Sequence, residues 1–533
     1  MQSLLQYRRL ENRILERKED EKRLAVPQEG QRKSDDHVYE VAANGDDSTE
    51  PRSWSPFHRW RAITIVWLLV FSQGWVSTCN SEATKLASRF YHVSETAQTL
   101  ATALFMVGLA IGALVAGPVS ETIGRNPVYL VSTFVMLCFT LGTALAPNFG
   151  AQLAFRFLAG LASSPTLSMY GGSLADLVDN DSRRSIWPVF AMSPLLGPVL
   201  APAAGGWIVG HLPWIWTVWI ALIFAGAVFL IALLFLPETF SPVLLWWKAQ
   251  HLRKVMEDDR YISPIEQAEP LIPRLKTNLA RPLIFFTTEP IVMSLGAYLV
   301  LIFVINFSFL NGFDFIFTQK YGLSQGITSL DFLSITVGVM IDVSLTPLYN
   351  RLVRRVIRRR CRAFVSKKNV ADNSSSESEE SPGREMDETV AEVVASPPPE
   401  LSLIRAALAS PFLPVSLYWL GWTNYPTINP ASGYAATVMF GYSFSAIFIS
   451  GYQYIIDSYE TYSSSALGSI TMARYLVAGP LIVATRPMYE GIGTHWSLTI
   501  VATLAVLLIP VPWILMRYGH HIRGKSKFAK EVG

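Results

Sequence analysis

The chain alternates between long apolar stretches and shorter polar ones, and twelve of the apolar stretches are long enough to cross a bilayer. A membrane-spanning helix needs about 20 mostly apolar residues. Because the unpaired edges of an open sheet cannot be satisfied in lipid, we expect every stretch to be helical. The predicted spans are residues 62–80, 97–117, 128–147, 151–174, 187–210, 214–236, 288–309, 327–349, 404–422, 434–455, 464–485 and 496–516.

The spans fall into two groups of six, separated by a charged stretch at residues 237–287. This arrangement predicts an all-α integral membrane protein with one six-helix bundle at 62–236 and a second at 288–516. Two six-helix halves related by an axis along the membrane normal are typical of transporters that bind substrate near the midplane of the membrane.

Composition and charge agree with this topology. Half of the residues are hydrophobic and only 16% are charged, against about 25% charged residues in soluble domains. Most of the 44 Lys and Arg residues lie in segments on one side of the predicted membrane, and few lie in the loops on the other side. The positive-inside rule therefore assigns both tails, residues 1–61 and 517–533, to the cytosol.

The N-terminal tail allows two interpretations. Leu4, Leu5, Leu10, Ile14 and Leu15 would line one face of a short amphipathic helix. The tail also mixes charges of both signs, which is typical of a solvated segment, and we favour a solvated tail.

Residues 351–403 form a polar insertion in the second bundle. The insertion opens with several arginines, which suit anionic inner-leaflet lipids. An acidic, serine-rich run (374–381) and a run of prolines (397–399) follow, and such a composition predicts disorder. The insertion would act either as a phosphorylated regulatory element or as a neutral spacer.

A short charged turn joins the second and third spans. It reads Gly117-Pro-Val-Ser-Glu121-Thr-Ile-Gly124-Arg125-Asn-Pro127, and Glu121 and Arg125 offer a charge pair that could form and break as the helices move. The pattern resembles the G-x-x-x-D/E-x-x-G-R-x-P loop between helices two and three of the major facilitator superfamily. The resemblance implies the two-bundle fold and a role for both charged residues in gating.

Span five is rich in proline and glycine, which would disrupt a helix in water but is tolerated in a membrane. It resembles the G-x-x-x-G-P-x-x-G-G element of proton-driven antiporters in that superfamily, with Ser193 in place of the first glycine. The resemblance implies a helix bend at the interface between the halves, and the alternative is close helix packing alone. The residues concerned are Pro194, Gly197, Pro198, Pro202, Gly205 and Gly206.

Arg156 and Arg474 lie well inside predicted spans, where a charge is costly unless it has a partner or a task. Arg156 in span four matches the family element L-x-x-x-R-x-x-x-G, whose arginine is associated with proton coupling, and Arg474 in span eleven would be its equivalent in the second half. The alternative for either is hydrogen bonding to carbonyl groups. Asp176 and Asp457 end spans four and ten, each an acid at the cytosolic edge, and they are further candidates for proton coupling or gating.

Few acidic residues lie near the membrane interior, and Asp342 is the leading candidate to carry the proton or bind a cationic substrate. It lies nine residues before Arg351, which is about 13 Å along a helix. Burial raises the pKa of a carboxyl group in general and a nearby arginine lowers it, so alternation between two surroundings could load and release a proton. A salt bridge to another span is the competing explanation.

Aromatic and amide side chains within the spans are candidates for a cavity that takes amphipathic molecules. The alternative is packing or an interfacial aromatic belt. The candidates are Trp67, Trp75, Asn306, Asn311, Asp314, Tyr442, Tyr452 and Gln453.

Further stretches narrow the resemblance to the fungal drug:proton antiporters with twelve spans, a family of multidrug and polyamine-type exporters. They include Glu50-Pro-Arg-Ser-Trp54-Ser before span one, Pro237-Glu-Thr-Phe240 after span six and Pro399-Glu-Leu-Ser-Leu403 before span nine. Asn311 stands where the family commonly has Glu, which weakens a polyamine-like cation as the substrate.

These observations predict a transporter that exports a small organic compound (a drug, toxin, organic acid or secondary metabolite) in exchange for protons by alternating access. The alternatives are a proton-symport importer and a membrane receptor that senses a small molecule without transporting it. We expect no enzymatic activity, no metal, no cofactor other than the proton gradient and no nucleic-acid partner. We expect a monomer in the plasma membrane, or alternatively in the vacuolar membrane, in contact with anionic inner-leaflet lipids.

Overall fold

The computed structural model describes residues 2–16, 39–41, 49–267, 284–318, 325–372, 398–459, 463–526 and 529. These residues group into two compact units. The N-terminal unit consists of Met1–Val178, Ser193–Thr288 and Ser464–Ala484, and the C-terminal unit consists of Asp179–Met192, Glu289–Ser463 and Thr485–Gly533.

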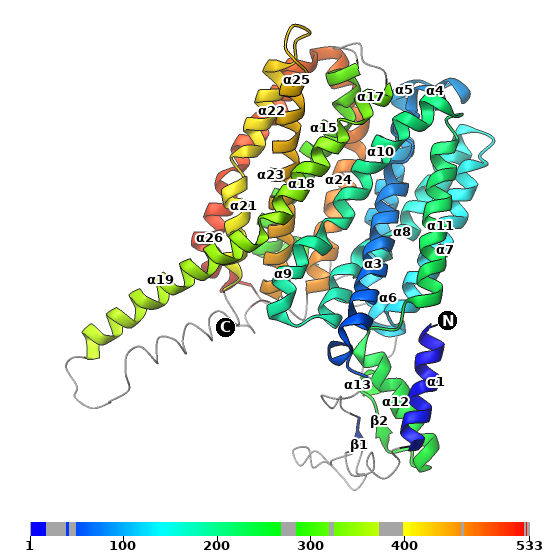
Figure 1. Cartoon of the computed structure of the whole chain (residues 1–533), viewed down its shortest axis with the longest axis vertical. Helices are drawn as coiled ribbons and strands as arrows, with labels where there is room; N and C mark the ends of the chain where they lie inside the picture. Colours follow the sequence, from blue (N-terminus) through cyan, green and yellow to red (C-terminus); the bar gives the residue numbers. More distant parts are fainter. Residues whose placement is uncertain are drawn as a thin grey trace. The chain divides into compact units, whose positions relative to one another are not determined.

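Within its described residues, the regular secondary structure of the N-terminal unit is helical apart from one pair of two-residue strands (Figure 1). Its membrane helices are α3 (Pro56–Thr78), α6 (Leu100–Ile123), α7 (Arg125–Ala144), α8 (Phe149–Leu177), α10 (Ser193–His211), α11 (Trp216–Phe235) and the first part of α24 (Ser463–Ile492). Its other elements are α1 (Gln2–Glu16), β1 (Tyr39–Glu40), η1 (Pro51–Ser53), α4 (Thr84–Phe90), α5 (Glu95–Gln98), α12 (Ser241–Met256), β2 (Tyr261–Ile262) and α13 (Pro264–Gln267).

Within its described residues, the regular secondary structure of the C-terminal unit is all helical (Figure 1). It contains α9 (Asn180–Ala191), α15 (Pro290–Phe313), the π-helix η2 (Asp314–Thr318), α17 (Gln325–Ser329), α18 (Phe332–Ser344), α19 (Thr346–Asp372), η3 (Pro399–Leu403), α21 (Ile404–Ala409), α22 (Phe412–Thr423), α23 (Ala431–Tyr459), the rest of α24, α25 (Thr494–Leu508) and α26 (Pro510–Arg523).

All twelve predicted spans are helical, which confirms the all-α membrane fold. Within the described ranges, ten helical segments are long and apolar enough to cross a membrane by composition. The first and fourth spans, α3 and α8, are less apolar because they bury polar side chains, among them Gln73, Gln152 and Arg156.

Glycines bring two pairs of helices into backbone contact, one pair in each unit. A Cβ atom added to Gly160 of α8 would overlap the carbonyl oxygen of Phe105 in α6. In the C-terminal unit, a Cβ atom on Gly441 of α23 would overlap the carbonyl oxygen of Ile335 in α18. The first pair consists of spans two and four, and the second pair consists of spans eight and ten. Corresponding helices of the two halves therefore make the same close backbone contact.

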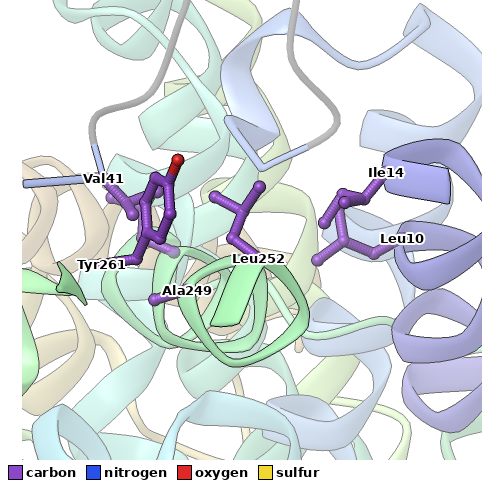
Figure 2. Close-up of a cluster of buried hydrophobic side chains, with 7 residues drawn as sticks. Leu10, Ile14, Val41, Ala249, Leu252 and Tyr261 are labelled. Atoms are coloured by element: carbon purple, nitrogen blue, oxygen red, sulfur yellow. The ribbon is translucent and has the colours of Figure 1, made fainter. Parts of the chain in front are cut away.

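The preference for a solvated N-terminal tail is wrong for residues 2–16, which form the amphipathic helix α1. Leu10 and Ile14 are buried against Leu252 of α12 (Figure 2). Val41 and Tyr261 lie on the other side of Leu252. The partner surface lies in the charged stretch after span six, so the N-terminal sequence alone did not reveal it. A parallel pairing of β1 with β2 adds to the same small subdomain.

The expected disorder of the insertion is wrong for its first part, because α19 continues to Asp372. Val353, Val356 and Ile357 lie on one face of this helix and pack against Leu401 and Ile404. That apolar face supports a helix even though exposed arginines cover the other faces. The serine-rich run at 374–381 lies outside the described residues.

Two membrane helices change unit along their length. Span five is interrupted at Met192, where α9 ends and α10 begins. The residues before Ser193 group with the C-terminal unit and those after Met192 with the N-terminal unit. In the same way, α24 groups with the N-terminal unit up to Ala484 and with the C-terminal unit from Thr485 onwards.

Candidate functional site

A cluster of charges in the N-terminal unit is organised by the turn between α6 and α7. The turn residue Gly124 has φ 105°, a conformation that glycine adopts readily and other residues do not. Arg125 then donates from Nε to Oδ2 of Asp176 at 3.1 Å and from Nη1 to Oγ of Ser120 at 2.7 Å. The sequence predicted a pair between Glu121 and Arg125. The ion pair formed by Arg125 is with Asp176, while the charge of Glu121 also acts on the guanidinium.

Glu238 completes this cluster and was not recognised as a site residue from the sequence. Its buried carboxylate accepts the backbone N–H groups of Arg125 (3.0 Å), Asn126 (3.1 Å), Thr239 (2.9 Å) and Phe240 (2.9 Å). It therefore caps the N-terminus of α7, where unpaired N–H groups favour a negative charge. Burial raises the pKa of Glu238, and the four N–H donors act in the opposite direction.

Arg156 and Arg474 both lie in the N-terminal unit. Arg156 is buried, and its Nη1 donates to the carbonyl of Val76 at 2.8 Å while Nη2 lies 3.2 Å from Sγ of Cys79. Arg474 is also buried, with its guanidinium over the ring of Tyr475 at 4.5 Å. From the sequence, we expected Arg474 to be the equivalent of Arg156 in the second half. The part of α24 that carries Arg474 groups with the N-terminal unit instead.

Asp342 of α18 is fully buried and engages three donor groups in the C-terminal unit. Arg405 of α21 contacts its two carboxylate oxygens at 2.8 and 2.7 Å, and Oγ of Ser445 donates to Oδ2 at 2.8 Å. The guanidinium of Arg405 also lies over the ring of Tyr349 at 5.1 Å. Two-point contacts between Arg and a carboxylate are strong and directional. The salt bridge to another span is therefore present, and its partner Arg405 was not identified from the sequence.

Asp457 lies near the end of α23 and faces α9 within the same unit. Arg183 and Arg184 of α9 approach its carboxylate oxygens at 3.6 and 3.9 Å, and Ser402 donates to Oδ2 at 3.3 Å. Trp187, one turn further along α9, donates from Nε1 to the carbonyl of Ile449 at 3.2 Å. These contacts attach the first part of span five to span ten.

The proline- and glycine-rich part of span five packs tightly on α3. A Cβ atom on Gly197 would lie 2.6 Å from the carbonyl oxygen of Phe71. Pro202 has no N–H to donate to the carbonyl of Pro198 four residues earlier, and Oγ1 of Thr78 donates to that carbonyl instead at 3.1 Å. The helix interruption lies at Met192, ahead of the motif. The remaining motif positions, Pro194, Gly205 and Gly206, lie within α10.

The residues proposed to line a substrate cavity are divided between the two units. In the N-terminal unit, Trp67 stacks on Phe71 with ring centroids 5.3 Å apart, and Trp75 lies 5.7 Å from the ring of Phe224. Trp75 therefore packs between α3 and α11, and Trp67 stacks on a residue of its own helix.

In the C-terminal unit, Asn311 donates to the carbonyl of Phe307 at 2.8 Å and Tyr452 packs on Phe448 at 4.4 Å. Asn306 is buried, and within the described part of the chain its Oδ1 has no hydrogen-bond partner. The side chain of Asp314 lies outside the described residues.

Tyr442 and Gln453 lie close to the Asp342 site. The hydroxyl of Tyr442 is 2.8 Å from that of Tyr349. Gln453 lines a small cavity of about 50 Å³ together with Tyr349 and Arg405. Of the proposed cavity residues, these two are therefore brought together with the buried ion pair.

Comparison with known proteins gives concordant matches. A family model described as the Major Facilitator Superfamily matches residues 66–366. The MFS-type transporter kojT of Aspergillus flavus is 40% identical over 486 residues, which cover 90% of this chain and 81% of kojT. The MFS-type efflux pump MFS2 of Trichophyton rubrum is 31% identical over 91% of this chain and 76% of the pump. The solved structure of the proton:xylose symporter XylE superposes with a TM-score of 0.57 at 14% identity, covering 87% of this chain and 96% of XylE, a likeness of fold alone.

Proposed function

Because the chain belongs to the major facilitator superfamily, and is thus a multi-pass membrane transporter rather than an enzyme, we propose that it exports a small organic compound in exchange for protons. The cargo is a drug, a toxin, an organic acid or a secondary metabolite. The proposed location is the plasma membrane, with both termini in the cytosol, and the alternative location is the vacuolar membrane.

The observation that supports proton coupling best is the buried site around Asp342. A carboxylate in a desolvated position is ionised only while a counter-charge holds it there. In the proposed cycle, a proton binds a carboxylate oxygen of Asp342, and the neutral acid releases Arg405. Loss of the proton on the opposite side of the membrane restores the ion pair, so each turnover carries one proton inward.

Export as the direction rests on separate observations. Span five carries the antiporter-like pattern, and its interruption at Met192 coincides with the change of unit. The relative in Trichophyton rubrum is named an efflux pump. We propose the same direction for this chain.

Cellular accumulation of a labelled compound panel, with and without the protein, tests the proposal. Reduced accumulation that a protonophore abolishes is the expected result. Increased accumulation would instead identify an importer, and ligand binding without flux would identify a receptor.

Reconstituted vesicles test the role of Asp342 directly. Asp342→Asn should abolish transport driven by a pH gradient, because the amide cannot take up and release a proton. The matched control is Asp258→Asn, which alters a half-buried acid paired with Arg260 outside the membrane helices. Gradient-driven transport by Asp342→Asn at the wild-type rate would exclude Asp342 as the proton carrier.

A further inference from the structure

A cavity of about 340 Å³ lies in the N-terminal unit, between α1, the start of α3 and α12. This volume falls in the range of small-molecule sites, about 300–1,000 Å³. It is separate from the Asp342 site, which belongs to the other unit. The described residues that line it are Gln2, Gln6, Arg9, Leu10, Arg13, Thr49, Ser53, Trp54, Ser55, His58, Arg61, Pro237, Leu244 and Trp247.

The ionisable groups of this lining are all basic. Arg9, Arg13, Arg61 and His58 line the cavity, and the described lining includes no Asp or Glu. The charge of Arg9 acts on Arg61, so two like charges are held near each other. Such an arrangement is unfavourable when the cavity holds only water and becomes favourable when an anion occupies it.

Arg61 shows the need for an acceptor most directly. Its Nε and Nη2 atoms are buried, and within the described part of the chain neither has a hydrogen-bond partner. A buried donor without a partner costs free energy, and the cost is larger for a charged group. A planar guanidinium presents its donors in a fixed fork that matches the oxygen atoms of a phosphate group.

Two carboxylates close to the cavity are directed elsewhere. Glu238 follows the lining residue Pro237, but its side chain accepts four backbone N–H groups around the start of α7. Glu11 of α1 points toward His251, with Oε1 4.0 Å from Nδ1. Neither acid therefore neutralises the lining arginines in place of a ligand.

The wall that carries Arg9 and Arg13 is held in place by packing. Leu10 and Ile14, on the same helix, are buried against α12 (Figure 2). Gln6 accepts the backbone N–H of Glu238 at 3.0 Å and ties α1 to the loop after span six. The two arginines are thus presented by a docked helix.

Exposed aromatic residues place the cavity near the membrane surface. Phe57 and Trp60 lie on the first turns of α3 and are 73% and 52% exposed. Aromatic side chains at a helix end gather at the level of the lipid headgroups. His58 and Arg61, which follow them directly in the sequence, line the cavity.

We propose that this cavity binds a multiply phosphorylated anion of the inositol phosphate type, either as the headgroup of a membrane lipid or as a soluble molecule. Several phosphate groups would satisfy the donors of Arg61 while neutralising Arg9 and Arg13. Because the ligand would join α1 to the start of α3, its binding would couple the N-terminal helix to the first membrane span.

Binding to the purified full-length protein tests the proposal with two probes. One probe is soluble inositol trisphosphate, and the other is phosphatidylinositol bisphosphate in nanodiscs, compared with phosphatidylserine nanodiscs. The double variant Arg9→Gln/Arg13→Gln should weaken binding about 25-fold, at about fivefold for each arginine removed. Arg8→Gln is the matched control, because Arg8 is exposed on the same helix and is not a lining residue.

Each outcome decides the proposal. If the soluble probe binds, a free anion is sufficient; if only the nanodiscs bind, the ligand is the lipid. In either case the double variant must bind that probe more weakly than the wild type does. Absence of binding to both probes overturns the proposal, as does equal weakening by Arg8→Gln or equal binding of phosphatidylserine. Because Arg9 and Arg13 are exposed, the double variant should retain the wild-type unfolding midpoint, which separates loss of the site from loss of the fold.

Discussion

Replacement of Gly124 by alanine is expected to destabilise the N-terminal unit strongly. Gly124 has φ 105° and ψ 166°, a region that is almost exclusive to glycine and costs other residues about 1–3 kcal/mol. The new Cβ would also lie 2.6 Å from Oε2 of Glu238. Displacing that carboxylate weakens its hydrogen bonds to the N–H groups of Arg125 and Asn126, and one bond to a charged group contributes about 1.5–3 kcal/mol.

Together these terms predict a loss of about 2.5–6 kcal/mol for Gly124→Ala. Gly117→Ala is the matched control in the same turn motif, because a Cβ atom there meets nothing within 4 Å. Gly117 is helical, so alanine should stabilise the protein by up to about 1 kcal/mol. Unfolding of the purified proteins by denaturant titration in one detergent measures both. A wild-type midpoint for Gly124→Ala, or an equal fall for Gly117→Ala, would refute the reasoning.

Three further changes test separate contacts by the same unfolding assay. Arg405→Gln should cost about 3–5 kcal/mol, because it leaves Asp342 buried without its counter-charge, and adding Asp342→Asn should recover part of that loss. Thr78→Val should lower the free energy of unfolding by about 1 kcal/mol, because the carbonyl of Pro198 loses its hydrogen-bond donor. The loss should be smaller in a Pro202→Ala background, where residue 202 supplies an N–H, and an unchanged loss would contradict this account. Gly160→Ala should cost about 1–3 kcal/mol by overpacking α6 against α8, and stability equal to wild type would disprove the backbone contact.

The membrane helices could be predicted from the sequence because each depends on a local property, the length of an apolar stretch. Asp342 was identifiable for a related reason, since an acid within such a stretch requires an explanation. Its partner Arg405 was not identified, because it lies 63 residues away at the start of another span. No periodicity connects the two residues.

The same reason explains why Glu238 and α1 were misjudged. Glu238 caps a helix that begins 113 residues earlier, so spacing within either motif could not connect them. The apolar positions of α1 suggested a helix, but a helix this short is marginal in water without a packing partner. That partner is α12, in the charged stretch between the two groups of spans.

The exchange of helical segments between the two units has a consequence for synthesis. Trp187 and its hydrogen-bond partner Ile449 are 262 residues apart, which takes roughly 13–52 s to translate at about 5–20 residues per second. During that interval α9 is already made while α23, to which it attaches, is not. The N-terminal unit likewise lacks Ser464–Ala484 until almost the whole chain has been translated. Neither unit can therefore finish folding as soon as its own half of the chain has been translated. Both units become complete only when the last spans have been inserted.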